Sequence, residues 1–230
     1  MFFESELGYN TNAMTMDFSD TIRQIIISAP PILAAIIFHE VSHGFVANKL
    51  GDPTAKFMGR LTLNPIAHID PVGTVILPAL LMLTGSPVFG WAKPVPINPA
   101  NFKDPKRDMA ISAAAGPITN IMLAIVSLLI LKFISYAAAL LPTSFVLPLT
   151  MMFKQSILIN VVLAAFNLLP IPPLDGGRVL VGLLPHKQAV AYSRIEPYGF
   201  FILIILLMTG IAGKLINPFI YLIFALLNLF

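Results

Sequence analysis

The stretch FHEVSH at residues 38–43 places two histidines and a glutamate inside a long apolar run. His39 and His43 are four residues apart, so on a helix their imidazoles lie one above the other on the same face. Glu40 lies one step around the helix, close enough to reach a water held by the same ion. This H-E-x-x-H pattern supplies two zinc ligands and a general base for peptide hydrolysis. Zinc lowers the pKa of its water to about 7, and the glutamate accepts the proton during attack on a carbonyl.

The alternative is a chance pattern whose histidines are satisfied by hydrogen bonds in a core. An ionisable side chain in a membrane-spanning helix costs roughly 2.5–3.5 kcal/mol even on lenient insertion scales, and such residues usually serve function. Two of the four histidines in the chain fall in this pattern. The sequence therefore favours metal binding over the chance pattern.

A catalytic zinc normally has three protein ligands and one open position for water. The chain has no cysteine, so carboxylates and the two other histidines remain as candidates for the third ligand. Asp175 in IPPLDGGR is the best of them, because the prolines before it cannot continue a helix. Irregular backbone at membrane depth is tolerated only where protein or a water cavity surrounds it. We therefore expect an interior loop that faces the metal, although a solvated aspartate in an interfacial turn is the other interpretation.

The two segments reach a similar depth in the membrane. His43 precedes Lys49 by six residues, which is about 9 Å along a helix at 1.5 Å per residue. Asp175 precedes Arg178 by three residues. Both lie near a basic end, so their side chains can meet at one ion that lies shallow in the membrane and is reached by water from that side.

The hydrophobic composition of the chain indicates which kind of structural element must position these residues. Hydrophobic residues make up 57% of the 230 residues and charged residues only 11%, whereas soluble domains are nearer a quarter charged. Long apolar runs of this kind indicate a polytopic membrane protein. No basic segment and small-residue cleavage site frame the first apolar run, so we expect no cleaved signal peptide. The basic and aromatic interleaving typical of nucleic-acid binding is absent, which argues against that partner.

The apolar segments predict an all-α polytopic membrane protein formed as a single domain over residues 1–230. We expect the catalytic core at about 22–185 and C-terminal helices at 197–230. The polar stretch GWAKPVPINP favours a short β element near the cytoplasmic face. The apolar segments are 22–50, 72–83, 109–141, 146–166, 198–211 and 215–230.

The second of these segments has 12 residues, whereas a spanning helix needs ~20. Cytoplasmic loops carry the excess of lysine and arginine. If the segment crosses the membrane, its flanking bases are divided between the two sides; if it is re-entrant, all of them lie in the cytoplasm. We expect one re-entrant segment, about five to six transmembrane helices in total, and an external N-terminus. The flanking bases are Lys49, Lys56, Arg60, Lys93, Lys103, Lys106 and Arg107.

Three motifs in this order resemble the site-2 protease family of intramembrane zinc metalloproteases. They are FHEVSHG at 38–44, AAGPITN at 114–120 and NLLPIPPLDGGR at 167–178. The resemblance implies one zinc ion ligated by His39, His43 and Asp175, with Glu40 activating water. It also implies that Asn167 holds substrate or stabilises the oxyanion, a task for which an amide donor is suited. A helix C-cap is the alternative for Asn167.

Other polar residues leave more than one interpretation open. The family's Gly-Pro-x-x-Asn motif matches Gly116, Pro117 and Asn120, where packing through small residues is as good an interpretation as catalysis. His68 and Asp70 could form a second polar pair near the mouth of the site, although a solvated histidine and a turn aspartate are the simpler interpretation. Some relatives carry PDZ or CBS domains, and we expect a minimal form without them.

The leading interpretation is a membrane zinc metalloendopeptidase, multi-pass in the cell membrane, with its active site near the cytoplasmic side. Its partners would be the lipid bilayer and transmembrane protein substrates, cut by regulated intramembrane proteolysis. A substrate helix hides its peptide bonds, so GWAKPVPIN or the stretch 59–64 is expected to hold it unwound at a strand edge.

Two further function classes are open. One is a catalytically inactive metal-binding membrane protein or a divalent-metal transporter. The other is a membrane protease with the same H-E-x-x-H pattern but with Glu196 as its third ligand, which is weaker because no second motif surrounds Glu196.

Overall fold

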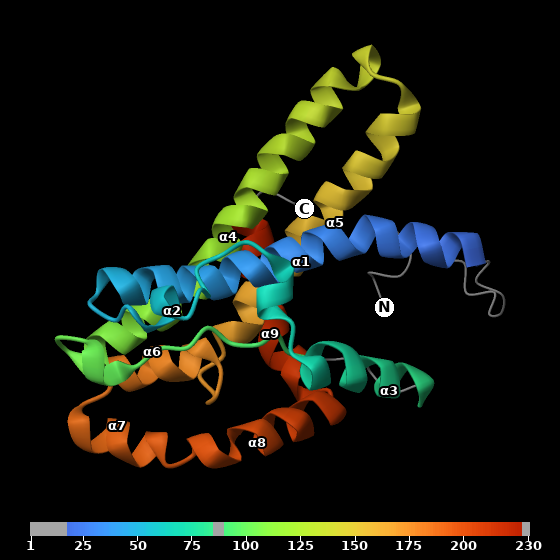
Figure 1. The fold of residues 1–230 in the computed structure, drawn as a ribbon. Helices are drawn as coiled ribbons and strands as arrows, with labels where there is room; N and C mark the ends of the chain where they lie inside the picture. The colour runs from blue at the N-terminus through green and yellow to red at the C-terminus, as the bar shows by residue number, and fades with distance from the viewer. Residues whose placement is uncertain (1–17, 85–89, 227–230) are drawn as a thin grey trace.

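The computed structural model describes residues 18–84 and 90–226, and three long helices form its framework (Figure 1). They are α1 (Phe18–Lys49), α4 (Pro105–Ala137) and α5 (Thr143–Asn167). α4 and α5 form a hairpin closed by the short helix η4 (Ala138–Leu140), and α1 crosses the base of that hairpin (Figure 1). Each of the three is long and apolar enough to cross a membrane. The helical architecture with long apolar helices expected from the sequence is therefore confirmed for the described residues, whereas the expected five to six spans and the re-entrant segment are not.

Shorter helices gather at the base of the hairpin. A lower layer is formed by α6 (Asp175–Leu183), α7 (His186–Ser193) and α8 (Glu196–Met208), and α9 (Ile211–Leu226) returns from it toward the hairpin (Figure 1). α7 and α8 meet at 63° and together are apolar enough to form one bent span. Between α1 and α4 the chain forms the short helices α2 (Thr54–Phe57) and α3 (Leu77–Leu83). By length and composition the described chain thus offers three candidate spans, or four with the bent pair.

Two apolar clusters join α9 to the long helices. The first lies where α4, α5 and α9 meet, and the second connects the end of α5 and the loop after it to the start of α9. The close packing of these apolar side chains determines the position of α9 against α5. The first contains Ala124, Leu128, Ile157, Val161 and Phe224, and the second Ala165, Leu169, Leu174, Ala212 and Ile216.

Four Asn-Pro or Asp-Pro pairs begin helical elements in the polar part of the chain. In each pair the Asn or Asp side chain accepts a hydrogen bond from a backbone N–H of the first turn, and proline occupies a first-turn position where no N–H is needed. The sequence therefore determines locally where this part of the chain turns. The caps Asn64, Asp70, Asn98 and Asp104 begin η1 (Pro65–His68), η2 (Pro71–Ile76), η3 (Pro99–Asn101) and α4.

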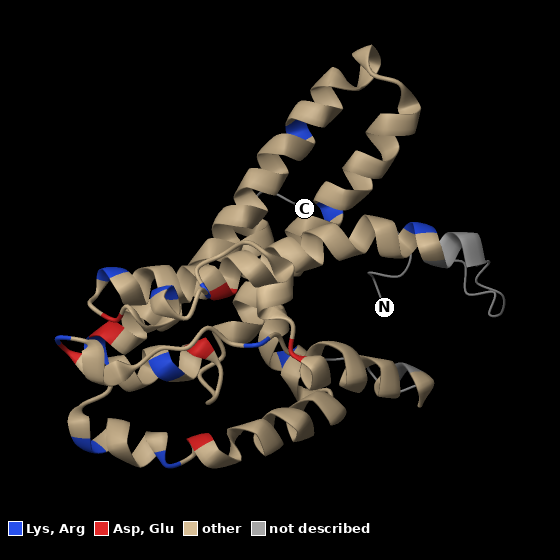
Figure 2. Cartoon of the chain, in the orientation of Figure 1, with Lys and Arg blue, Asp and Glu red and all other residues tan. Residues whose placement is uncertain are grey.

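Charged residues are distributed unevenly over the fold. Figure 2 shows most of them at the end of the molecule where α1 ends, α4 begins and α7 lies. Beyond the first turn of α4, the α4–α5 hairpin carries two separate bases, Lys132 and Lys154. The basic loops predicted from the sequence therefore lie at this polar end of the molecule.

The stretch 90–98 is extended but does not pair with a strand, and residues 18–84 and 90–226 contain no β-strand. The expected β element is not confirmed. Pro94 and Pro96 have no N–H to donate, so this stretch cannot complete a ladder. Loops bind it instead: the Trp91 N–H donates to the Gly73 carbonyl (3.1 Å) and the Lys93 N–H to the His68 carbonyl (2.9 Å).

Asp52 ties the far end of this stretch to the end of α1. Its fully buried carboxylate accepts hydrogen bonds from the Asn98 N–H (2.7 Å) and from Asn101 Nδ2 (2.7 Å). Burial alone would raise the pKa of Asp52, but hydrogen bonds from Thr54, Asn101 and Asn98 together lower it below its ordinary 3.8. The loop after α1 and the segment before α4 are thus bonded directly to each other.

Candidate metal centre

α1 carries His39 and His43 one turn apart, and both side chains are buried. Their rings meet edge to face, with centroids 4.7 Å apart. This is the arrangement expected from their four-residue spacing on a helix.

Asp175 is the first residue of α6 and follows an irregular loop at 168–174. Part of the loop is interior, since Leu169 and Leu174 are buried, whereas Pro170 and Pro173 are exposed. A Cβ on Gly176 would lie 2.3 Å from the Leu168 carbonyl oxygen, and one on Gly177 would lie 2.7 Å from the Pro172 nitrogen. Only glycine at both positions lets α6 begin this close to the loop, and that approach directs the Asp175 carboxylate inward.

The three side chains converge on one point. Asp175 Oδ2 lies 3.1 Å from His39 Nε2 and 3.3 Å from His43 Nε2. Zinc bonds of 2.0–2.2 Å in tetrahedral geometry put two ligand atoms about 3.3 Å apart. The three residues form the group of His, Asp and Glu side chains within the described chain that could hold a metal ion.

The hydrogen bond made by the outer nitrogen of His43 leaves its inner nitrogen, Nε2, without a hydrogen to donate to Asp175. His43 Nδ1 lies 2.8 Å from the Ser112 carbonyl oxygen, which can only accept, so this nitrogen carries the hydrogen and Nε2 presents a lone pair. Despite the short distances, Asp175 Oδ2 is buried and has no hydrogen-bond partner among the described residues. A lone pair facing a carboxylate oxygen is repulsive unless a cation lies between them. The donor set of imidazole and carboxylate suits zinc, so the residues fit that metal.

α4 approaches the imidazoles through Gly116. A Cβ at this position would lie 2.5 Å from His43 Nε2 and 2.6 Å from His39 Cε1. One turn further along α4, Asn120 is fully buried and its Oδ1 lies 2.5 Å from His39 Nδ1. The Gly-Pro-x-x-Asn motif therefore lies directly against the candidate ligands.

Glu40 lies beside the group and is not part of it. Its Oε2 accepts a hydrogen bond from the Val95 backbone N–H at 2.9 Å. Prolines on both sides of Val95 restrict the backbone, which fixes the direction of that N–H. One carboxylate oxygen of Glu40 is thus held by the extended stretch, while Oε1 receives no hydrogen bond from the described residues.

A cleft of about 620 Å³ opens next to this stretch, a volume typical of ligand sites. Val95 and Ile97 line one wall, Met109 of α4 another, and Arg178 of α6 a third. The candidate ligands do not line this cleft themselves. It lies next to them through Val95, whose N–H binds Glu40, and through Arg178, one turn beyond Asp175.

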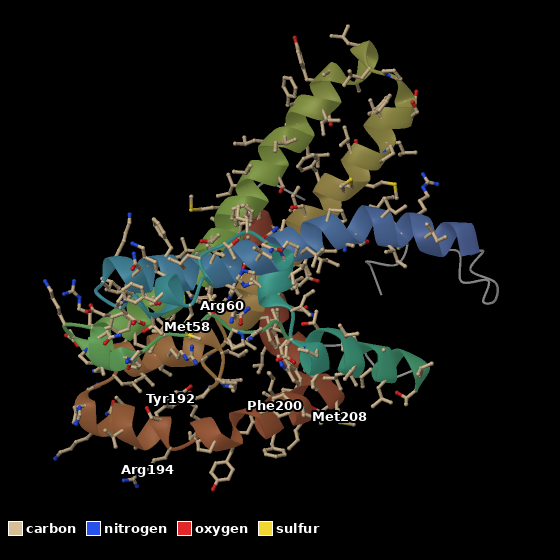
Figure 3. All side chains as sticks on the ribbon, in the orientation of Figure 1. Met58, Arg60, Tyr192, Arg194, Phe200 and Met208 are labelled. Atoms are coloured by element: carbon tan, nitrogen blue, oxygen red, sulfur yellow. The ribbon has the colours of Figure 1, made fainter. Side chains whose placement is uncertain are left out.

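The α7–α8 arm closes the far side of the site. Tyr192 and Phe200 point from this arm toward the rest of the bundle (Figure 3). The Tyr192 hydroxyl donates to the Pro170 carbonyl (2.5 Å), and the Phe200 ring meets Trp91 edge to face, with centroids 5.8 Å apart. The arm therefore contacts both the loop before Asp175 and the start of the extended stretch.

The remaining candidates have other partners. Asn167 Nδ2 donates to the Leu163 carbonyl (3.0 Å), one turn back in its own helix. His68 Nε2 donates to the Thr62 carbonyl (2.8 Å), whereas Asp70 caps η2, so the structure does not join these two residues as a pair. Glu196 begins α8 and lines the cleft outside the ligand group.

Sequence reasoning missed three contacts of this centre, made by Ser112, Asn120 and Val95. Two of them use backbone groups, which carry no residue signature. The polar side chain of Asn120 in an apolar helix was the one available signal.

Comparison with known proteins gives independent information. The sequence model of peptidase family M50 matches residues 29–210. The chain is 37% identical to "Putative zinc metalloprotease YwhC" of Bacillus subtilis, over 81% of this chain and 82% of that protein. It is 28% identical to "Putative zinc metalloprotease Rip2" of Mycolicibacterium smegmatis, over 88% of this chain and 77% of the relative. No solved structure gives a significant match.

Proposed function

The chain belongs to peptidase family M50, and from that membership we propose that it is an intramembrane endopeptidase that cuts transmembrane substrate helices. Membership makes it a membrane zinc metalloprotease, a hydrolase with zinc as its cofactor. The observation that carries the finer proposal is the convergence of His39, His43 and Asp175 beside Glu40, within reach of a cleft. We treat residues 1–230 as one domain with its catalytic core at 22–185.

In the proposed reaction His39, His43 and Asp175 hold one zinc ion. When bound, zinc supplies Lewis acidity toward water and toward the substrate carbonyl. Glu40 accepts the proton of the attacking water and later delivers it to the leaving amine. The Val95 N–H holds Oε2 of Glu40, so Oε1 is the oxygen that receives this proton.

Asn167 is proposed to stabilise the oxyanion or to hold the substrate. It lies at the end of α5, directly before the loop that leads to Asp175. Its amide uses one N–H on the Leu163 carbonyl, which leaves its second N–H available as a donor. An amide donor aimed at a developing oxyanion typically contributes about 2.7–4 kcal/mol of transition-state stabilisation.

The cleft beside residues 90–98 is proposed to receive the unwound part of the substrate. Within the described chain no hydrogen bond reaches the carbonyls of Pro94 and Pro96, and neither residue has an N–H. This edge therefore only accepts hydrogen bonds, so a bound peptide would donate its own N–H groups to it.

We propose that residues 71–83 are re-entrant and that the active site opens to the cytoplasm. The support is the pair of bonds that join the flanks of this segment, from Asn101 to Asp52 and from Arg60 to the Lys93 carbonyl (2.8 Å). Flanks bonded to each other lie on the same side of a membrane, and both carry lysines. With α1, α4, α5, α8 and α9 crossing, this gives five spans in the cell membrane.

The second candidate function is a metal-binding membrane protein without catalysis, or a divalent-metal transporter. A transporter needs ligands that are reached from both faces of the membrane. Here His43 lies six residues before Lys49 at the end of α1, and Asp175 lies three residues before Arg178. Glu40 stands beside the candidate ligands without being one of them. This arrangement favours the protease.

The test of the proposed function is Glu40→Gln in purified, zinc-loaded protein with a transmembrane substrate. Glutamine still accepts from Val95 but takes no proton, so zinc content should remain at one ion per chain while cleavage falls at least about 100-fold. Asp175→Asn should instead lower zinc content.

Cleavage by Glu40→Gln at the wild-type rate would overturn the assignment of the base. Zinc carried across a proteoliposome membrane, with no peptide cut by the wild type, would favour the transporter.

A further inference from the structure

The candidate ligand His39 is connected to α5, a helix that provides no ligand. Asn120 of α4 stands between them: its Oδ1 lies 2.5 Å from His39 Nδ1 and its Nδ2 donates to Asn160 Oδ1 at 2.8 Å. Asn160 Nδ2 donates in turn to the Ser156 carbonyl at 2.8 Å. Asn120 and Asn160 are among the most deeply buried side chains of the described chain.

The Ser156 carbonyl of α5 determines which atom donates in each hydrogen bond of the series Asn160–Asn120–His39. The Ser156 carbonyl can only accept, so the amide nitrogen of Asn160 must face it and its oxygen must face Asn120. The nitrogen of Asn120 is therefore turned to Asn160, and it also donates to the Ala35 carbonyl (3.2 Å). The oxygen that remains faces His39 and requires a hydrogen on Nδ1.

This order decides the tautomer of the imidazole. With the hydrogen on Nδ1, His39 Nε2 presents its lone pair toward Asp175 and His43. With the opposite tautomer, Nε2 would carry a hydrogen and could not bind a metal. The bond from Asn120 to Ala35 additionally holds the turn of α1 that precedes His39.

We propose that Asn120 is a positioning residue for the metal, and that Asn160 of α5 sets its orientation. The inference deepens the proposed function, because it assumes that His39 is a ligand. Groups that fix the outer nitrogen of a ligating histidine typically change metal affinity by 10–100-fold. A buried pair of amides in an apolar helix interface has a high desolvation cost, which this role explains.

The test measures zinc affinity of the full-length protein in detergent by competition with a chromophoric chelator. Asn120→Leu removes the acceptor and should raise the zinc Kd by about 10–100-fold. Asn120→Asp keeps an acceptor for Nδ1–H but loses the donor to Asn160 and to the Ala35 carbonyl. Its zinc Kd should therefore lie between those of the wild type and of Asn120→Leu. Asn160→Ala leaves the Ala35 carbonyl as the remaining partner that orients the Asn120 amide, so it should weaken binding less than Asn120→Leu. The absorption spectrum of bound Co²⁺ reports ligand geometry independently of activity.

Ser127→Ala is the matched control, since it removes a part-buried α4–α5 hydrogen bond (Ser127 to the Ser156 hydroxyl, 2.8 Å) and leaves the bonds of Asn120 and the bond of Asn160 to the Ser156 carbonyl in place. Its zinc affinity should equal that of the wild type. Wild-type affinity in Asn120→Leu, or an Asn120→Asp variant as weak as Asn120→Leu, would refute the inference. If Asn120→Leu does not fold, the zinc affinities of Asn120→Asp and Asn160→Ala test the inference instead. A wild type that binds zinc but cuts no peptide would reject the proposed function alone.

Discussion

At the scale of single residues, Gly116 shows how closely the helices must approach to form the centre. The position has no room for a side chain, because two imidazole rings occupy the space where a Cβ would lie. The small residue of this motif is therefore required by the two imidazoles of the candidate centre, in addition to helix packing.

We expect Gly116→Ala to lose zinc while the helices still form. The added methyl group must push at least one imidazole away, so zinc affinity should fall about tenfold or more and stability by about 1–3 kcal/mol. Metal analysis and thermal unfolding of the purified variant measure both effects. Gly213→Ala is the control, since a Cβ there meets no atom within 4 Å. Equal zinc content in the two variants would show that the rings tolerate the methyl group.

The spacing of His39 and His43 was enough to predict that they share a face, because a helix fixes that geometry locally. The convergence with Asp175 followed from the loop prolines and the depth of the two segments. The contact of Asn120 with His39 was not predictable, since it depends on the rotation of α4 about its own axis. The separate partners of His68 and Asp70 depend on long-range loop packing in the same way.

At the scale of elements, the extended stretch 90–98 is held at several points by groups from earlier parts of the chain. Trp91, Lys93, Val95 and Asn98 each donate a backbone hydrogen bond. The sequence predicted extended backbone here correctly, but the β pairing was not confirmed because Pro94 and Pro96 remove donors that a ladder needs.

The Asp52 carboxylate should make this attachment sensitive to acid. Its pKa is lowered in the folded protein, so its contribution to stability is present above the unfolded value of 3.8 and is lost as pH falls through the folded value. Asp52→Asn should therefore be less stable than the wild type at pH 7, with the difference shrinking below about pH 4. Thermal unfolding of both proteins in detergent across this range measures it. A difference that does not depend on pH would rule out titration of Asp52 as the cause.

At the scale of the whole molecule, the absence of cysteine in the sequence makes the topology directly measurable. Single cysteines at Lys56, Lys103 and Ser144 sample the two flanks of residues 71–83 and the tip of the α4–α5 hairpin. Re-entrance predicts that a membrane-impermeant thiol reagent labels Ser144→Cys on intact cells, and labels Lys56→Cys and Lys103→Cys only after permeabilisation.

Labelling of Lys56→Cys and Lys103→Cys from opposite sides would show that residues 71–83 cross the membrane. The cysteine-free wild type provides the background signal. The expected external N-terminus lies outside the described residues, and a cysteine there would extend the same assay.

The candidate ligands come from helices at distant points of the chain, α1 near its start and α6 after the hairpin. The ribosome therefore makes both imidazoles long before it makes the carboxylate. During synthesis the chain passes through the insertion machinery without the carboxylate that would complete the proposed zinc site. The enzyme is thus expected to stay inert beside the nascent helices around it, and to become active only after its own hairpin has been inserted.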